Sequence, residues 1–204
     1  MLEIEKELWD KGYNYIACID EVGRGCLLGD VVVCAIIMNK GDLIEGVKDS
    51  KKLSQKKREN LYDNIIERAV GVGIGRVDAA TVDKINIKNA TLLAMEKAIE
   101  NIKDKEGNSL KPDYVLIDAE KLNIDIPQTS IVKGDEKCHG IASASIIAKV
   151  YRDRLCIDWD EEYPGYGIAK HKGYGTKQHR EMILEHGPTP IHRKTFLTKI
   201  LSQK

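Results

Sequence analysis

Acidic residues end several apolar segments of this sequence. Asp20 and Glu21 directly follow the apolar residues 15–19, and Asp118 ends the apolar segment YVLID. A short strand in QTSIVKGD is expected to end at Asp135, within GDE. An ionised carboxylate at the rim of an apolar core is unfavourable unless a cation compensates its charge. The acids therefore predict either ion pairs or a bound metal.

The sequence allows either protein cations or metal ions to supply the positive charge. Arg24 and Lys133 lie near the acids in the sequence and could pair with them. Carboxylates without a matching group of histidines or cysteines favour Mg²⁺ or Mn²⁺ over zinc. Two such ions about 4 Å apart would activate a water molecule and stabilise the leaving oxygen in phosphodiester hydrolysis. Adjacent strand residues point to opposite faces, so Asp20 and Glu21 share a site only if the strand ends beside them.

Charged residues are unevenly distributed along a chain that has no net charge. Residues 164–204 carry eight Lys and Arg against two Asp and Glu, and a second basic cluster lies in VKDSKKLSQKKR, at residues 47–58. Such clusters usually form a solvated surface. Because these two flank the acidic motifs, they favour a polyanionic substrate.

The composition is typical of a globular protein with one ordinary domain. The chain has 204 residues, of which 42% are hydrophobic, and no apolar run approaches the roughly 20 residues of a membrane helix. The segment MLEIEKELWDKG lacks the basic start and apolar middle of a secretory signal, so we expect a cytoplasmic protein without membrane contact. The five cysteines include no CxxC pair, which argues against a disulfide framework or a zinc site.

The order of elements predicts an α/β fold with a mixed central sheet flanked by helices. Apolar and β-branched runs predict strands over residues 15–20, 31–38, 70–77 and 114–118. A short fifth strand is predicted to end at residues 134–136. Apolar residues at helical spacing predict helices over 54–68, 87–103, 141–159 and from 176 onward. The glycines of the strand at 70–77 are expected to admit a close neighbour. We divide the chain into a catalytic domain, 1–163, and a basic C-terminal helical extension, 164–204.

Several motifs occur together in an order that resembles the ribonuclease HII family. These are DEVGRG, DSKKLS, VLIDAE, KGDEK, ASASIIAKVYRD and YPGYGIAKHKGYGT, and the resemblance extends from about residue 15 to 196. It implies a ribonuclease H-like fold and a metal-dependent endonuclease that uses Mg²⁺ or Mn²⁺. The implied substrates are RNA–DNA hybrids and duplex DNA that contains single ribonucleotides. Cleavage would fall on the 5′ side of the ribonucleotide and leave 3′-hydroxyl and 5′-phosphate ends, and we expect a monomer.

The resemblance also assigns roles to residues that match the family motifs. The catalytic and metal-binding acids would be Asp20, Glu21, Asp118 and Asp135. The substrate would be contacted by Gly23, Arg24, Gly25, Lys51 and Tyr174. The Gly-Arg-Gly backbone would meet the 2′-hydroxyl, because glycine lets the main chain approach closely. The tyrosine would stack at the ribose-to-deoxyribose junction, and the lysine would bind phosphate.

The sequence departs from the family pattern in three places. Cys26 and Asp30 stand where the family usually has proline, and Cys138-His139 interrupts a stretch usually richer in small residues. Without proline, the turn after Gly25 is expected to be less rigid.

Some roles have alternatives. Asp153 could be a direct metal ligand or could form ion pairs with Arg152, Arg154 or a basic loop. His171 and His179 match no zinc spacing, so we expect ordinary polar residues at both positions. A DNA nuclease of the same fold and a catalytically silent hybrid-binding module are the two rival functions, and the presence of all four acids argues against the second.

Overall fold

A computed structural model describes residues 1–202, in which five strands form one mixed sheet. The strands are β1 (Ile16–Val22), β2 (Val31–Met38), β3 (Ala69–Val77), β4 (Tyr114–Asp118) and β5 (Gln128–Ile131). Their order in the sheet is β3-β2-β1-β4-β5. β2 pairs antiparallel with β1 and β3, whereas β4 pairs parallel with β1 and β5. The predicted mixed α/β sheet is confirmed.

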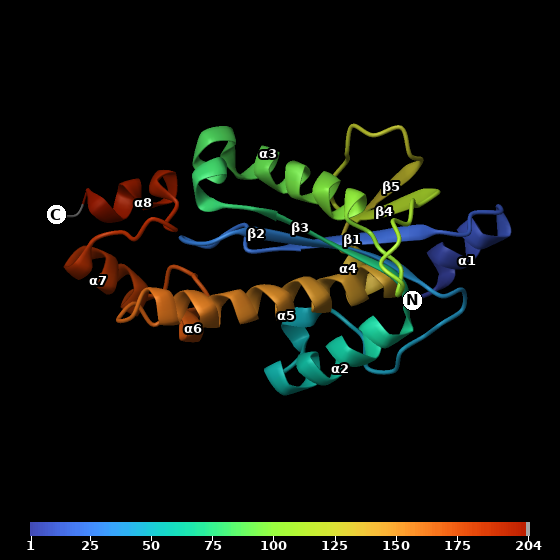
Figure 1. The fold of residues 1–204 in the computed structure, drawn as a ribbon, viewed down its shortest axis with the longest axis horizontal. Coiled ribbons are helices and arrows are strands. Elements are labelled where there is room, and N and C mark those ends of the chain that lie inside the picture. The colour runs from blue at the N-terminus through green and yellow to red at the C-terminus, as the bar shows by residue number, and fades with distance from the viewer. Residues whose placement is uncertain (203–204) are drawn as a thin grey trace.

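Helices cover both faces of the sheet and extend beyond one end of it (Figure 1). They are α1 (Glu3–Asp10), α2 (Gln55–Arg68), α3 (Ala79–Glu100), α4 (Gly134–Lys137), α5 (His139–Glu162), α6 (Ile168–His171), α7 (Lys177–His186), α8 (Lys194–Leu201) and the short 3-10 helix η1 (Ser50–Lys52). α3 packs on one face, against β2 and β3, and α5 packs on the other, against β1 and β2. β2 is apolar on both faces for this reason.

The glycines of β3 allow α3 to approach the sheet closely. A Cβ atom at Gly73 would overlap the carbonyl of Ala98, and one at Gly75 would overlap the carbonyl of Ala94. Alanine on the helix and glycine on the strand therefore bring the two backbones together. The prediction that this run is a strand with a close neighbour is confirmed.

The start of α3 and the end of β5 differ from the sequence prediction. α3 begins at Ala79, eight residues earlier than predicted, after Asp78 caps the helix by accepting from the Thr81 N–H; the helix is interrupted at Asn86, where φ is 66°. β5 ends at Ile131, so Asp135 lies in the first turn of α4 and does not end a strand. The chain leaves the sheet there because Lys133 adopts a left-handed conformation and the Gly134 N–H bonds to Asp118.

The basic C-terminal residues pack against the loop that joins β1 to β2. Leu28 forms an isolated β-bridge with His192, and the Arg193 N–H donates to the Leu27 carbonyl at 2.8 Å. In Figure 1 this places α7 and α8 at the end of the molecule opposite α1. Within residues 1–202, none of the helices is long and apolar enough to span a membrane.

Candidate active site

Neighbouring strands bring Asp20, Glu21 and Asp118 together. β1 and β4 run parallel in the register Ile19↔Ile117, so Asp20 and Asp118 follow at the same level. The strand β1 does not end there as expected; it continues to Val22, paired with β2. Pairing with β4 stops one residue before Asp20, which leaves that side of β1 open and lets adjacent acids reach one edge of the sheet.

Asp135 joins this group through α4. The Gly134 N–H donates to Asp118 Oδ1 at 2.8 Å, which fixes the start of α4 next to the end of β4. A hollow of about 370 Å³ is lined by Asp118 and Asp135 together with Asp49 and Lys51. We call Asp20, Glu21, Asp118 and Asp135 the acidic edge.

Negative charge accumulates at the acidic edge without full compensation. Burial raises the pKa of Asp20 well above its usual value, and the neighbouring charge of Glu21 raises it further, while a hydrogen bond from Ser145 acts in the opposite direction. Burial also raises the pKa of Glu21, although Arg24 opposes this shift. The folded protein therefore holds carboxylates in a place that disfavours their ionised form, and a cation there would relieve this.

Asp49 is an additional acid that the sequence analysis missed. It is buried, its Oδ1 accepts from the Lys51 N–H, and it lines the same hollow as Asp135. Burial raises the pKa of Asp135, with further contributions from the charges of Asp49 and Asp118, whereas Lys51 lowers it. Asp49 stands in DSKKLS, a motif from which only the lysine was singled out.

The donor atoms of the acidic edge suit a hard divalent metal. The four predicted acids offer only carboxylate oxygens, and Glu21 Oε2 is buried without a hydrogen-bond partner. Such oxygens are the usual ligands of Mg²⁺ and Mn²⁺. No three of these acids bring an oxygen each within 4.8 Å of the others among residues 1–202, so closing on one ion requires side-chain rotation.

Arg24 contacts the acids through its side chain. Its Nη1 lies 2.8 Å from Glu120 Oε1 and 3.3 Å from Glu21 Oε1. The guanidinium therefore compensates part of the charge, as the ion-pair alternative expected.

The two glycines beside Arg24 have different surroundings. Gly23 has a φ of 92°, and a Cβ atom there would overlap Arg152 and lie 2.8 Å from the Asp30 carbonyl. A Cβ atom at Gly25 would meet nothing within 4 Å. Gly23 is thus required by the fold itself, and only Gly25 faces open space.

Two fully buried arginines hold the turn that lacks the usual prolines. Arg193 donates to the carbonyls of Arg24, Cys26 and Gly29 at 2.8–3.1 Å. Arg152 donates to the carbonyls of Leu28, Asp30 and Lys172 at 2.7–3.1 Å. The Asp30 side chain pairs with Arg76 at 2.8 Å. The sequence analysis missed both buried arginines, because nothing in the sequence distinguishes an arginine that binds backbone carbonyls from one on the surface.

Tyr174 lies beside this turn, in the tyrosine loop (residues 172–176). The Leu27 N–H donates to the Gly173 carbonyl at 2.8 Å, which joins the tyrosine loop to the β1–β2 turn. The Tyr174 side chain is 44% exposed, so the ring is available to a partner and is not a buried anchor. Partial burial raises the pKa of the Tyr174 hydroxyl above its usual value.

Three buried histidines support the tyrosine loop. His179 Nδ1 donates to the Tyr174 carbonyl at 2.9 Å, and its Nε2 lies 3.1 Å from Nε2 of His192. The His192 Nδ1 accepts from the N–H of Thr189, so His192 Nε2 is the donor between the two rings. His171 stacks on His179 with ring centroids 4.0 Å apart. Burial lowers the pKa of His179 and of His192 to about 4, so both rings are neutral at pH 7.

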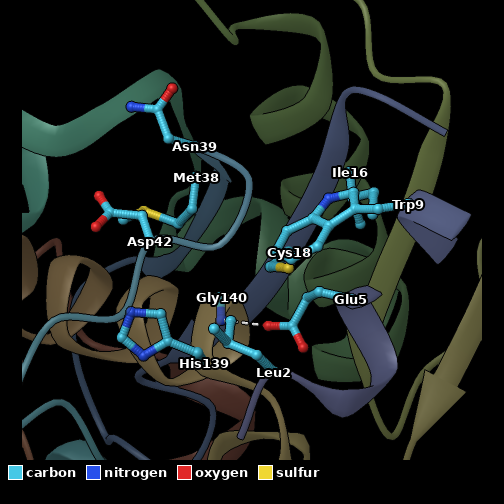
Figure 2. Close-up of a pocket in the computed structure, with 10 residues that line it drawn as sticks. All are labelled: Leu2, Glu5, Trp9, Ile16, Cys18, Met38, Asn39, Asp42, His139 and Gly140. Carbon is cyan, nitrogen blue, oxygen red and sulfur yellow. Dashed lines mark hydrogen bonds between the residues drawn. The ribbon is translucent and has the colours of Figure 1, made fainter. Parts of the chain in front are cut away.

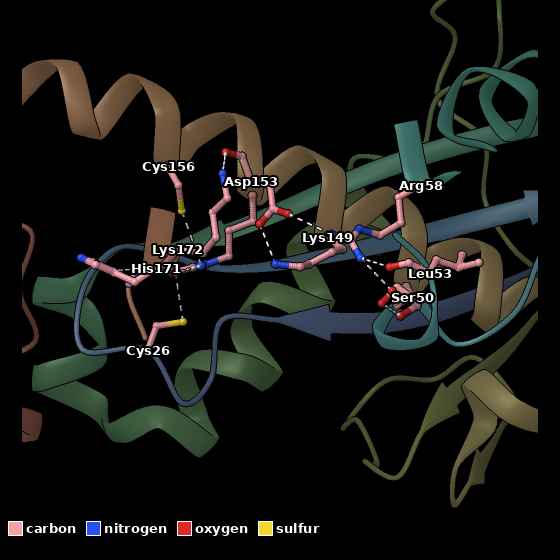
Figure 3. Close-up of polar contacts among 12 residues, drawn as sticks. Cys26, Ser50, Leu53, Arg58, Lys149, Asp153, Cys156, His171 and Lys172 are labelled. Atoms are coloured by element: carbon pink, nitrogen blue, oxygen red, sulfur yellow. Dashed lines mark hydrogen bonds and ion pairs between the residues drawn. The ribbon is translucent and has the colours of Figure 1, made fainter. Parts of the chain in front are cut away.

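Asp153 is already paired with two cationic side chains. Lys149 Nζ lies 2.6 Å from its Oδ1, and Arg58 of the basic cluster lies 3.7 Å from its Oδ2 (Figure 3). The ion-pair alternative therefore describes this residue, with partners other than Arg152 and Arg154. Arg58 also donates to the carbonyls of Ser50 and Leu53, so the contact ties the segment that carries Lys51 to α5.

Comparison with known sequences agrees with these motifs. The family model described as Ribonuclease HII matches residues 17–199. The ribonuclease HII of Alkaliphilus oremlandii is 60% identical over 200 residues, which cover 98% of each protein. The ribonuclease HII of Caldicellulosiruptor bescii is 48% identical over 201 residues, which cover 98% of this chain and 95% of the relative.

Solved structures share the fold over nearly the whole chain. A chain from the structure of the PCNA:RNase HII complex of Archaeoglobus fulgidus matches with a TM-score of 0.74 at 27% identity, covering 91% of this chain and 96% of its own length. The ribonuclease H2 of Pyrococcus horikoshii OT3 matches with a TM-score of 0.74 at 24% identity, covering 92% and 97%. The expected ribonuclease H-like fold is confirmed, and the chain belongs to the ribonuclease HII family of ribonuclease H hydrolases.

Proposed function

We propose that this ribonuclease H cuts the phosphodiester on the 5′ side of single ribonucleotides embedded in duplex DNA, and also cuts longer RNA–DNA hybrids. The products would carry 3′-hydroxyl and 5′-phosphate ends. The contact between Leu27 and Gly173 carries the proposal, because it joins the turn that follows the acids to the exposed Tyr174. Chemistry and recognition of the junction would then take place within one continuous surface.

The acids of the acidic edge would bind two Mg²⁺ or Mn²⁺ ions. When bound, these ions would supply an activated water and stabilise the charge on the leaving oxygen. Asp20, Glu21 and Asp118 would provide most of the ligand oxygens. Asp135 would complete the set from the hollow, where it could also orient the attacking water. Lys51 would bind a phosphate, since it is exposed and has no ion pair among residues 1–202.

Backbone groups of Gly23-Arg24-Gly25 would read the ribose. The 2′-hydroxyl is both a donor and an acceptor, and it distinguishes RNA from DNA at a given position. Arg193 Nη1 donates a hydrogen bond to the Arg24 carbonyl at 2.9 Å, which would orient this peptide before substrate binds. The Tyr174 ring would pack on the deoxyribose that follows the ribonucleotide.

Residues 164–204 would act as an extension that completes the substrate site. They contribute Tyr174, Lys172 and the histidines, and they surround the β1–β2 turn through His192 and Arg193. We further propose that one chain acts alone, as a monomer in the cytoplasm, because all the residues assigned to the site come from a single chain.

Gly25 provides the sharper test of ribose recognition. Cleavage of a duplex with one ribonucleotide, an all-DNA duplex and an RNA–DNA hybrid should be measured with Mg²⁺, Mn²⁺ or chelator. Gly25→Ala should reduce cleavage of both ribose-containing substrates at an unchanged melting temperature, since its added methyl group enters open space. Gly23→Ala should instead lower the melting temperature, because its methyl group meets Arg152.

The outcomes separate the proposal from its rivals. Wild-type cleavage of the all-DNA duplex at a similar rate would favour the DNA nuclease, and binding of hybrid without any cleavage would favour the silent module. Full activity of Gly25→Ala would contradict the assignment of ribose recognition to this turn.

A further inference from the structure

A buried cluster of two thiols and one carboxylate lies behind the acidic edge. Cys18 lies on β1, and Glu5 approaches it from α1 (Figure 2). Cys138 stands at the N-cap position of α5. All three are buried, and one potential ligand atom of each lies within 4.8 Å of the other two. They are the only such group of three found within residues 1–202.

The distances within this cluster match tetrahedral coordination. Cys18 Sγ and Cys138 Sγ are 3.9 Å apart. Two zinc–sulfur bonds of about 2.3 Å at a tetrahedral angle place the sulfurs about 3.8 Å apart, whereas a linear arrangement places them about 4.6 Å apart. Cys138 Sγ lies 3.2 Å from Glu5 Oε1, close to the roughly 3.5 Å expected for a sulfur and an oxygen on one tetrahedral ion.

The Glu5 carboxylate is only partly satisfied by the protein. Its Oε1 accepts from the Gly140 N–H at 3.1 Å and from Cys138 Sγ, as a cap of α5 would. Its Oε2 is buried and has no hydrogen-bond partner among residues 1–202, which is unfavourable for a carboxylate oxygen. A small cavity of about 10 Å³ adjoins the cluster, enough for one water-sized ligand.

The surrounding backbone keeps the thiols accessible to each other. A Cβ atom at Gly140 would overlap Cys18 Sγ and lie 2.8 Å from its Cβ. Glycine at this position therefore lets the start of α5 approach β1 closely enough for the thiols to face one another.

We propose that Glu5, Cys18 and Cys138 form a second metal site, for a thiophilic divalent ion of the zinc type, with one solvent molecule as fourth ligand. Binding would form two metal–sulfur bonds and one metal–oxygen bond, and the two thiol protons would pass to solvent. The site differs in chemistry from the acidic edge, which offers only hard oxygen donors. It would join β1, two residues before Asp20, to the segment that follows Asp135.

Cobalt distinguishes the two sites, because thiolate ligands give Co²⁺ an intense charge-transfer absorption that carboxylates do not. The full chain should be stripped of metal with chelator, kept reduced and titrated with Co²⁺. We expect one equivalent with this absorption, which added Zn²⁺ removes by displacement. The Asp118→Asn and Cys156→Ser variants should retain the signal, whereas Cys18→Ser and Cys138→Ser should lose it.

Glu5→Gln provides a milder test, since it keeps the shape of the side chain and the Gly140 contact but removes the charged ligand. It should weaken Co²⁺ binding at least tenfold. The proposal does not depend on variants that fold poorly, because the wild-type titration alone can overturn it. A wild-type chain without the absorption would show that the cluster is a hydrogen-bonded thiol pair, and retention of the signal in Cys138→Ser would place the ion elsewhere.

Discussion

The acidic edge and the tyrosine loop are connected through the β1–β2 turn but are stabilised in opposite ways. At the acidic edge, burial and mutual repulsion raise the pKa values of Asp20, Glu21 and Asp135, and Arg24 compensates only part of the charge. Around the tyrosine loop, the buried groups are the neutral histidines His171, His179 and His192, whose ring nitrogens have partners. The acidic edge therefore favours cation binding, whereas the tyrosine loop is held in place by hydrogen bonds within the protein.

This difference has a physical reason. A cation-binding site must hold charges that repel one another when the cation is absent, which lowers the stability of the folded chain. A surface that recognises a sugar gains from being ordered beforehand, because less conformational entropy is then lost on binding. The predictions that follow change one region while the other is left intact.

The largest effect is expected from removing a charge at the acidic edge. Asp20→Asn and Asp118→Asn should each abolish cleavage, since the charge and ligand capacity disappear while the shape is kept. In the absence of metal, Asp20→Asn should also raise the melting temperature, because a buried repelling carboxylate is gone. Cleavage assays and thermal unfolding test this, and substantial activity at saturating metal in either variant would refute the site.

A large effect is also expected at Asp135, and a small one at Asp153. Asp135→Asn should lower turnover by orders of magnitude with little change in substrate affinity, because the residue lies in the hollow beside Asp118. Asp153→Asn should instead lower stability, since it leaves Lys149 and Arg58 without their partner. Steady-state kinetics and denaturation of the two variants check this, and the opposite pattern would exchange their roles.

Removal of the Tyr174 ring should reduce cleavage at a single embedded ribonucleotide more than cleavage of a uniform RNA–DNA hybrid. Tyr174→Ala should lower cleavage at a single embedded ribonucleotide at least tenfold, about 1.4 kcal/mol of transition-state stabilisation. Cleavage of a uniform hybrid should fall less, because it presents no ribose-to-deoxyribose junction. Values of kcat/KM on both substrates decide the matter, and equal losses would mean that the ring only anchors its loop.

Lowering the pH should reduce the contribution of the buried histidines to folding stability and increase that of the acidic edge. His179 and His192 have pKa values of about 4 when folded and about 6.5 when unfolded, so the unfolded chain binds more protons between these values. Their stabilising effect is complete above pH 6.5 and is lost as the pH falls toward 4. Asp20 acts oppositely, because its raised pKa means that the folded chain takes up its proton first.

The Asp20→Asn variant separates these two contributions. Its free energy of unfolding should fall more steeply than that of the wild type when the pH is lowered from about 6.5 to 5. Urea denaturation without metal at several pH values measures both slopes. Parallel slopes would show that the acid and histidine contributions do not oppose each other.

The smallest effect is expected at the exposed Lys51. Lys51→Gln should weaken binding to every duplex and reduce the slope of log affinity against log salt by about one unit, as loss of one phosphate contact does. Lys56→Gln, in the same basic cluster but outside the hollow, is the matched control. An unchanged slope would leave Lys51 as an ordinary surface lysine.

Features that repeat along the chain, or that stand near the ends of apolar runs, could be predicted from the sequence. The apolar runs predicted the sheet, and Asp118 stands at the end of β4 as predicted, whereas β1 continues past Asp20 to Val22. Asp135 was expected at the end of a strand and lies in α4, because the bond between Gly134 and Asp118 diverts the chain. A contact of this kind between distant segments leaves no periodic pattern.

Other parts of the site were invisible in the sequence for the same reason. Within residues 1–202, Arg152 and Arg193 have no carboxylate in ion-pair contact; they bind backbone carbonyls, which every residue has. The cluster of Glu5, Cys18 and Cys138 joins positions up to 133 residues apart, so a search for close cysteine pairs does not detect it. Asp49 stands within a motif and could have been found by considering every acid near the lysines of DSKKLS.

The contacts of Arg193 also affect how this protein is made. Arg193 binds the Arg24 carbonyl across 169 residues, so the turn beside the acids can be held only after synthesis has reached Arg193. Domains generally fold from the N-terminus as the ribosome releases them. A nascent chain could thus complete its sheet while the turn is still unsupported. Nuclease activity would then begin only after Arg193 has been added, and chains that end before it would remain inactive even if they retained every acidic residue.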